Sequence, residues 1–251
     1  MVDGLMLNAN EKFDRNCDGC ADGKQRRKPF PKKSDRNGTD ILEIVHSDVG
    51  CVNITSVGGS KYYVTFIDDY SRFTTIYFLK NKSEVLQKFK EFAATAENLS
   101  GKRIKILRSD NGGEYTSREF NQFCVDHGIK RELTIPMSPQ QNGVSERMNR
   151  TIMESARSML HHASMPLKFW AEAVNTAVYL RNRCPTIALN GQTPYEVWYG
   201  HKPDVSNLKV FGCNTHVHVP DEKRSKLDKK SVKCIFVGYL DTSKGYKLYD
   251  L

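Results

Sequence analysis

The stretch RIKILRSDNGGEYTSREF, residues 103–120, contains the three local signals that decide the fold. Ile104 and Ile106 alternate with charged residues at the period of a strand, and Asp110 falls on the same face at its end. The Asn-Gly-Gly that follows is typical of a turn, and residues 116–128 have the pattern of a helix that stops at a glycine. We therefore expect strand, turn and helix, with Asp110 either a turn-former or part of a chemical site.

The rest of the chain places this unit in an α/β fold. The segments with strand patterns are 41–49, two runs within 57–80, 103–110 and 129–135, and those with helix patterns are 81–101, 116–128, 144–162, 166–184 and 193–200. The order β-β-β-α-β-α-β-α predicts a mixed sheet with helices packed on it. From about residue 208 short strands and turns replace the helical period, which predicts a small separate β domain.

Two helices carry more detailed predictions. For 81–101 we expect Ser83 as the N-cap and Gly101 as the stop. The apolar face of that helix is predicted to contain Val85, Phe89, Phe92 and Ala96. The apolar stripe of the helix 144–162 is predicted to be Val144, Met148, Ile152, Ala156 and Met159.

Composition and charge narrow the class of partner. Of the 251 residues 39% are hydrophobic and 27% charged, and no run of about 18 apolar residues indicates a membrane span, so no membrane partner is expected. The net charge of +9 favours a polyanion such as nucleic acid. Lys and Arg concentrate in residues 24–36 and 223–233, although a solvated surface explains each run equally well. Seven scattered cysteines argue against a disulfide framework and for a reducing compartment.

Three carboxylates fall at the ends of predicted elements. Asp48 ends the first strand, Asp110 ends the fourth, and Glu146 lies in the first turns of the long helix. In this strand order the first and fourth strands can be neighbours, which would bring the three side chains to one edge of the sheet. Carboxylates so placed repel one another unless cations are present, and hard Mg²⁺ suits oxygen ligands. Two such ions can assist phosphodiester displacement on nucleic acid, although turn formation remains an alternative for Asp110.

Five blocks of the sequence resemble the integrase of copia-type LTR retrotransposons. They are HSDV at 46–49, GGSKYYVTFIDDYSR at 58–72, RSDNGGEY at 108–115, TIPMSPQQNGVSERMNRT at 134–151 and KVFGC at 209–213, in the order and spacing of that family. The resemblance, which runs from about Lys12 to the end, implies an RNase H-like core of the retroviral integrase superfamily, with a five-stranded mixed sheet. It also implies a domain layout: zinc-finger remnant and basic linker at 1–38, catalytic core at 39–205, and an SH3-like β domain at 206–251.

The resemblance carries the family's catalytic and metal-binding triad onto Asp48, Asp110 and Glu146, with Mg²⁺ or Mn²⁺ as the ion. It implies an endonuclease and polynucleotidyl transferase that processes DNA 3′ ends and inserts element DNA into target DNA. The expected partners are double-stranded DNA and further copies of the chain. The expected location is the nucleus when target DNA is used, and a cytoplasmic virus-like particle before that.

The N-terminal segment departs from the family. Cys17 and Cys20 resemble the Cys half of its zinc finger, but no histidine precedes them, and a structural zinc needs four ligands. We therefore expect a truncated finger with an incomplete zinc pair. The basic tail after it, with Lys24, Arg26 and Arg27, is a candidate DNA-binding segment or an import signal.

Further DNA contacts are expected around the Glu146 helix. Gln141 and Asn142, in the loop before it, can bond bases or phosphates. Asn149 and Arg150 follow Glu146 by three and four residues and are predicted to share its side of the helix, although Arg150 is also placed to pair with Glu154.

Two rival functions remain open on sequence grounds. One is a non-catalytic nucleic-acid-binding remnant or host-adopted module, which the missing finger half favours. The other is a plain nuclease of the same fold, against which the finger remnant and the β domain argue.

Overall fold

A computed structural model describes residues 38–134, 143–240 and 245–250. All that follows concerns these residues, which belong to the unit Arg36–Leu251. Its elements in chain order are β1 (Ile44–Cys51), β2 (Tyr62–Asp68), β3 (Thr74–Leu79), the 3₁₀ turn η1 (Lys82–Glu84), α2 (Val85–Ser100), β4 (Ile106–Ser109), α3 (Gly113–Thr116), α4 (Arg118–Asp126), β5 (Lys130–Leu133), α5 (Gly143–His162), η3 (Leu167–Phe169), α6 (Trp170–Arg183), η4 (Ile187–Leu189), α7 (Pro194–Tyr199), β6 (Asn214–His218), η5 (Asp221–Lys223), β7 (Ser231–Tyr239) and β8 (Tyr246–Asp250).

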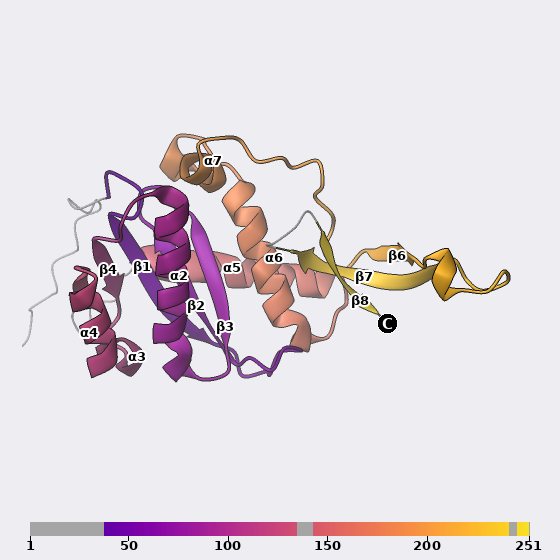
Figure 1. The fold of residues 1–251 in the computed structure, drawn as a ribbon, viewed down its shortest axis with the longest axis horizontal. Helices are drawn as coiled ribbons and strands as arrows, with labels where there is room; N and C mark the ends of the chain where they lie inside the picture. The colour runs from indigo at the N-terminus through magenta and orange to yellow at the C-terminus, as the bar shows by residue number, and fades with distance from the viewer. Residues whose placement is uncertain (1–37, 135–142, 241–244, 251) are drawn as a thin grey trace, which may run out of the picture. The chain divides into compact units, whose positions relative to one another are not determined.

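The main sheet has five strands in the order β3-β2-β1-β4-β5 (Figure 1). The first three strands form an antiparallel meander, whereas β1, β4 and β5 run parallel. The predicted mixed sheet with flanking helices is confirmed. The predicted pairing of the first and fourth strands is also confirmed, and it places the end of β4 beside β1.

Side-chain alternation along the strands creates two cores. Val64 and Phe66 on one face of β2 pack with Phe89 of α2 and Phe120 of α4. On the other face Tyr63 packs with residues of α5 and α6, such as Ile152 and Trp170. Each face of the sheet therefore carries its own helical layer, which explains why the strands are apolar on both sides.

The start of α2 differs from the prediction, and its end does not. The Asn81 side chain accepts from the backbone of Glu84 while the Glu84 carboxylate accepts from the Asn81 N–H, so this reciprocal pair caps the first turn in place of Ser83. The predicted apolar face is buried, and Gly101 ends the helix with φ of 67°, a left-handed conformation that favours glycine.

A second sheet, β6-β7-β8, is antiparallel throughout and confirms the predicted small C-terminal β region. It packs on α6, where the Thr176 hydroxyl donates to the carbonyl of Val237 at 3.4 Å and Lys247 pairs with Glu172 at 2.8 Å. Gly212, just before β6, has φ of 82°, and a Cβ there would lie 2.2 Å from the Cβ of Ala163. Only glycine allows this close approach to the end of α5. No helix in the described segments is long and apolar enough to cross a membrane.

Candidate active site

Asp48 lies on β1, and Asp110 directly follows β4, the parallel neighbour of β1. The last paired residues of β1 and β4 are His46 and Arg108, so each aspartate lies two residues beyond this pair and the two are level along the strand axis. β1 does not end at Asp48 as predicted. It continues to Cys51 because its pairing with β2 persists, with Asp48 opposite Thr65. The result is one carboxylate within a strand and one directly after its neighbour.

The turn after Asp110 is built differently from a glycine turn with positive φ. Asp110 Oδ1 accepts from the Gly112 N–H at 3.2 Å, so the carboxylate is also a local turn-former. Gly112 has φ of −61°, which any residue can adopt. A Cβ on Gly112 would meet only the flexible end of the Glu114 side chain, 2.8 Å away, and that end can move, so neither backbone nor packing requires glycine here.

Glu146 reaches the same region from the first turn of α5, where its side chain is exposed. Burial raises the pKa of the Asp48 carboxyl, the hydrogen bond from Asn149 lowers it, and the negative charges of Asp110 and Glu146 raise it again. Asp110 and Glu146 are therefore both near enough to act electrostatically on the Asp48 carboxyl, and a common site for the three stays a prediction.

Asn149 occupies a position that the sequence prediction missed. It is only 7% exposed, its Nδ2 donates to Asp48 Oδ2 at 2.7 Å, and its Oδ1 accepts from the Thr65 hydroxyl at 3.0 Å. Both polar atoms of its amide are engaged inside the protein, and the predicted contact of Asn149 with DNA stays a prediction. Asn149 holds the Asp48 carboxylate, and Thr65 fixes which way the amide points.

The missed position follows from the register of α5. Its buried residues are Ser145, Asn149, Ile152, Ala156 and Leu160. The prediction included Ile152 and Ala156, but it placed Val144, Met148 and Met159 on that stripe, and these are only partly buried. The spacing of four, three, four and four that begins at Ser145 is also helical, yet two polar residues hid it from a search for apolar ones.

The donor set fits a hard divalent cation. All three groups are carboxylates. The negative charges of Asp110 and Glu146 raise the pKa of Asp48, and a bound cation would lower it again. Within the described segments, however, no three His, Cys, Asp or Glu side chains are grouped as a metal site requires. The chemistry of the donors therefore matches Mg²⁺, and in this structure the three carboxylates interact through charge without closing around a point.

The other acidic pair, Asp68 and Asp69 at the end of β2, has a structural environment. Asp68 accepts from the backbone of Leu42 and from the backbone and hydroxyl of Ser71. Asp69 Oδ1 accepts from His46 Nε2 at 2.8 Å and from Arg72 at 3.1 Å. The contacts with Ser71 and Arg72 close the turn between β2 and β3.

Comparisons with known proteins agree with this architecture. Residues 41–139 match the family "Integrase core domain", and residues 213–251 match the "Retroviral polymerase SH3-like domain". Over 235 residues the chain is 54% identical to the retrovirus-related Pol polyprotein from transposon TNT 1-94 of Nicotiana tabacum, covering 93% of this chain and 18% of that protein. It is 38% identical over 241 residues to the Pol polyprotein from transposon RE1 of Arabidopsis thaliana, covering 96% and 16%.

The chain belongs to the integrase region of copia-type retrotransposon Pol polyproteins. It spans less than a fifth of the length of these two relatives. Its integrase core places it in the polynucleotidyl transferase superfamily.

Solved structures add information on the fold alone. A chain of the simian T-cell lymphotropic virus intasome, in complex with PP2A regulatory subunit B56 gamma, matches with a TM-score of 0.59 and 16% identity. The match covers 94% of the present chain and 86% of that chain. The HTLV-2 integrase catalytic core, solved in complex with magnesium, has 22% identity over 64% of the integrase region and 99% of that chain, with a TM-score of 0.48.

The remaining predicted residues divide into two groups. Arg150 is exposed on α5, one turn beyond Glu146, where a DNA phosphate can reach it. The others lie outside the described residues: Cys17, Cys20, Lys24, Arg26, Arg27, Gln141 and Asn142. Their predicted roles in zinc and DNA binding stay predictions.

Proposed function

We propose that this integrase region catalyses DNA 3′-end processing and strand transfer, with Asp48, Asp110 and Glu146 as its catalytic and metal-binding carboxylates. The observation that carries the proposal is that Asp48 on β1 and Asp110, directly after the parallel neighbour β4, each lie two residues beyond the last pair of these strands, with the charge of Glu146 acting on Asp48. A carboxylate whose ionisation is opposed by the negative charges of its neighbours suits a site that takes its positive charge from bound ions.

Each residue has a distinct part in this proposal. Asp48, held by Asn149, and Asp110, at the end of β4, are the fixed ligands. Glu146 is exposed and completes the site from α5. Mg²⁺ or Mn²⁺, when bound there, would activate the attacking oxygen and stabilise the leaving oxygen.

The reaction consists of two phosphodiester displacements. In the first, water attacks a phosphorus near the DNA end, the P–O3′ bond breaks, and the retained strand ends in a 3′-hydroxyl. In the second, that hydroxyl attacks a target phosphorus and displaces a target 3′-oxygen, which leaves with a proton. Water or the DNA itself supplies each attacking oxygen, so no covalent enzyme intermediate is required.

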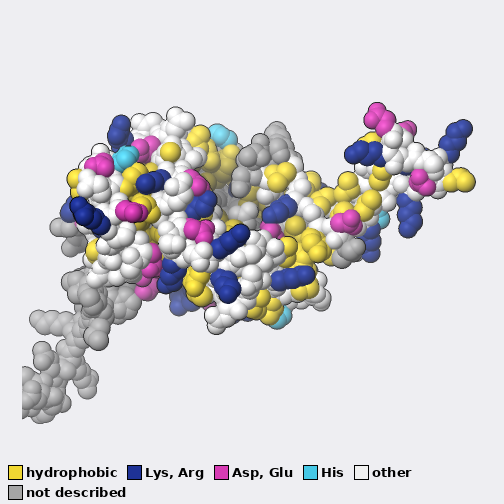
Figure 2. Space-filling view, turned by 60° about the horizontal axis from the view of Figure 1, so that its bottom comes forward, with side chains coloured by type: hydrophobic (Ala, Val, Ile, Leu, Met, Phe, Trp, Pro, Cys, Tyr) yellow, Lys and Arg dark blue, Asp and Glu magenta, His cyan; other side chains and the backbone are white. Residues whose placement is uncertain are grey.

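The surface suits a polyanionic substrate. Lys223, Lys226, Lys229, Lys230 and Lys233 are all exposed around η5 and the start of β7. Figure 2 shows Lys and Arg side chains at the end of the molecule formed by this hairpin and at several further points on the same face. Such charges bind DNA through its phosphates without sequence preference. Joining two DNA ends calls for more than one copy of the chain, and use of chromosomal target DNA calls for the nucleus.

The test is strand transfer with duplex oligonucleotides that carry the element's own termini, in Mg²⁺ and in Mn²⁺. We expect the wild type to join them to a plasmid target and Asp110→Asn to be inactive although it still binds DNA. Equal activity of the two proteins would exclude the assigned role of Asp110. DNA binding by an inactive wild type would instead favour the non-catalytic module.

A further inference from the structure

Tyr115 links β1, which carries Asp48, to the short helix α3 that follows Asp110. Its hydroxyl lies 2.6 Å from the Ser47 hydroxyl, and both side chains are fully buried. Ser47 directly precedes Asp48 on β1, whereas Tyr115 lies on the short helix α3 that follows Asp110. One hydrogen bond thus joins the residue before Asp48 to a residue five positions after Asp110, although the two are 68 positions apart in sequence.

The connection to Asp110 is short and continuous. Asp110 Oδ1 accepts from the N–H of Gly112, and Gly112 is the N-cap of the helix that carries Tyr115. On β1, successive side chains face opposite sides of the sheet. Ser47 therefore faces Tyr115 while Asp48 faces Asn149 of α5, so Asp48 is constrained from both sides of the sheet.

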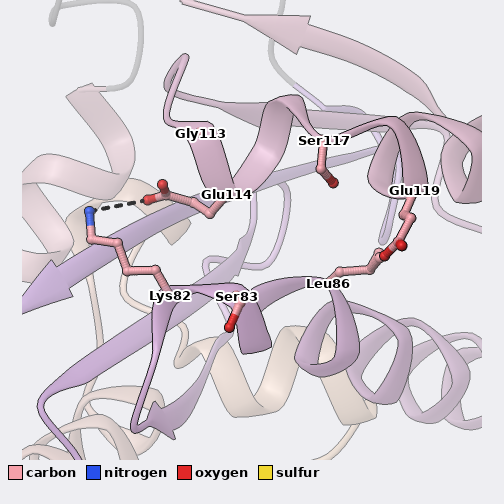
Figure 3. Close-up of a pocket in the computed structure, with 7 residues that line it drawn as sticks. All are labelled: Lys82, Ser83, Leu86, Gly113, Glu114, Ser117 and Glu119. Atoms are coloured by element: carbon pink, nitrogen blue, oxygen red, sulfur yellow. Dashed lines mark ion pairs between the residues drawn. The ribbon is translucent and has the colours of Figure 1, made fainter.

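Other contacts of α3 show that Tyr115 is its main anchor. The Tyr115 ring packs edge-on against Phe120 at 5.6 Å, and its carbonyl accepts from the Arg131 guanidinium on β5. On the outer side of α3, Glu114 pairs with Lys82 at 3.6 Å across a depression of about 350 Å³ (Figure 3). The Lys82 side chain is 51% exposed, so this outer pair contributes little beside the buried hydroxyl contact.

The electrostatics keep the Tyr115 phenol neutral. Burial raises its pKa well above the usual value, the Ser47 hydrogen bond lowers it, and the negative charges of Asp48 and Asp110 raise it. A neutral, fully buried phenol is suited to hold a hydrogen bond and not to exchange protons with a substrate. A phenylalanine would fill nearly the same space, so the hydroxyl is what adds the link to β1.

We propose that Tyr115 is a positioning residue, which through Ser47 fixes the Asp110 turn relative to Asp48 and so sets the spacing of the two carboxylates. The proposal rests on the proposed function for its effect on catalysis, and on geometry alone for its effect on the turn. Groups that orient ligand residues in this way alter metal affinity by about 10-fold or more when removed.

The first experiment measures hydrogen exchange without metal. In Tyr115→Phe we expect the amides of residues 110–116 to exchange about fivefold faster, while those of β3 are unchanged. Tyr70→Phe, which alters an exposed tyrosine in the turn between β2 and β3, is the matched control and should leave residues 110–116 unchanged. Unchanged exchange at 110–116 in Tyr115→Phe would overturn the proposal whether or not the protein is an active integrase.

The second experiment measures strand transfer against Mg²⁺ concentration. We expect Tyr115→Phe and Ser47→Ala each to raise the half-maximal Mg²⁺ concentration about 10-fold, and the double variant to raise it no further, since both remove the same bond. A purely structural tyrosine would lower the melting temperature and leave the Mg²⁺ midpoint unmoved, which contradicts the proposal. An inactive wild type would refute the proposed function and leave the exchange result to decide on Tyr115.

Discussion

Two residues of β1, His46 and Asp48, each lie beside acidic side chains, and the two places differ in the charges that surround the acids. Beside His46, the carboxylate of Asp69 meets an imidazole N–H, the Arg72 guanidinium and the backbone N–H of Gly38. Beside Asp48, the neighbouring charges are those of Asp110 and Glu146. We call the first set (His46, Asp69, Arg72) the paired cluster and the second (Asp48, Asp110, Glu146) the carboxylate cluster.

The acidities of the two clusters diverge accordingly. Burial raises the pKa of Asp69, but the His46 hydrogen bond, the Arg72 charge and the Gly38 N–H together lower it to about 2. Burial and like charges raise the pKa of Asp48 despite its bond from Asn149. Both aspartates are largely withdrawn from solvent, so burial does not separate a structural acid from a functional one. The sign of the neighbouring charges does.

The largest expected effect is that of Asp48→Asn, which breaks the carboxylate cluster. We expect strand transfer to fall on the order of 10³-fold, because several kcal/mol of charge stabilisation are lost with a metal ligand. The melting temperature of the metal-free protein should not fall, since one of three like charges is removed.

The measurement pairs strand-transfer rates with thermal melts taken with and without Mg²⁺. Mg²⁺ should raise the melting temperature of the wild type and not that of Asp48→Asn. Equal stabilisation of both proteins by Mg²⁺ would show that the ion binds elsewhere.

Asp69→Asn tests the paired cluster and should act on stability instead. The change removes the anionic partner of His46 and Arg72 and leaves buried donors poorly paired, so we expect a loss of about 2–4 kcal/mol in the free energy of unfolding. Urea denaturation measures it, with strand transfer per folded molecule as the second readout. A loss of activity without a loss of stability would reverse the roles assigned to the two clusters.

The pH dependence of stability provides the control for that variant. The pKa of Asp69 is lower in the folded protein than its ordinary value of 3.8, so its stabilisation is present above pH 3.8 and is lost as the pH falls toward 2. The wild type should lose about 2 kcal/mol more than Asp69→Asn over this window. Asp48 has the opposite sign: its raised folded-state pKa means that its contribution to stability falls as the pH rises above 3.8.

The comparison also explains what the sequence could predict. The adjacency of β1 and β4 could be expected from the element order, because the first and fourth strands of a β-β-β-α-β unit can be neighbours. Apolar periodicity along the chain predicts that order. The adjacency then brings the region of Asp48 close to that of Asp110 without any knowledge of side chains.

What escaped prediction depends on tertiary partners. In the sequence Asn149 looks like an exposed polar residue close to Glu146. It is buried because the fold brings it to Asp48, which is 101 residues away in the chain. Ser47 and Tyr115 are likewise 68 residues apart. A polar residue buried by a distant polar partner carries no local signal that separates it from one on the surface.

A smaller effect is expected from Asn149→Ala, which leaves the carboxylates in place and removes a support. We expect strand transfer to fall about 10- to 100-fold, as for other groups that orient metal ligands. Thr65→Val, which deletes only the hydroxyl that aims the Asn149 amide, should have the same kind of effect at smaller size. A normal rate in Asn149→Ala would mean that Asp48 keeps its orientation without this bond.

The smallest effect is expected from Arg150→Gln, because Arg150 belongs to neither cluster. It is exposed on α5 one turn from Glu146, so it can contact a DNA phosphate but cannot orient a ligand. We expect weaker DNA binding with a salt dependence reduced by about one phosphate contact, and an unchanged Mg²⁺ midpoint. Arg157→Gln, on the same exposed row about two turns further from Glu146, is the matched control. Similar losses of DNA binding in both variants would place the DNA along the whole helix. A shift in the Mg²⁺ midpoint for Arg150→Gln would instead show that a positive side chain acts on the carboxylate cluster. That result would contradict the difference drawn between the two clusters.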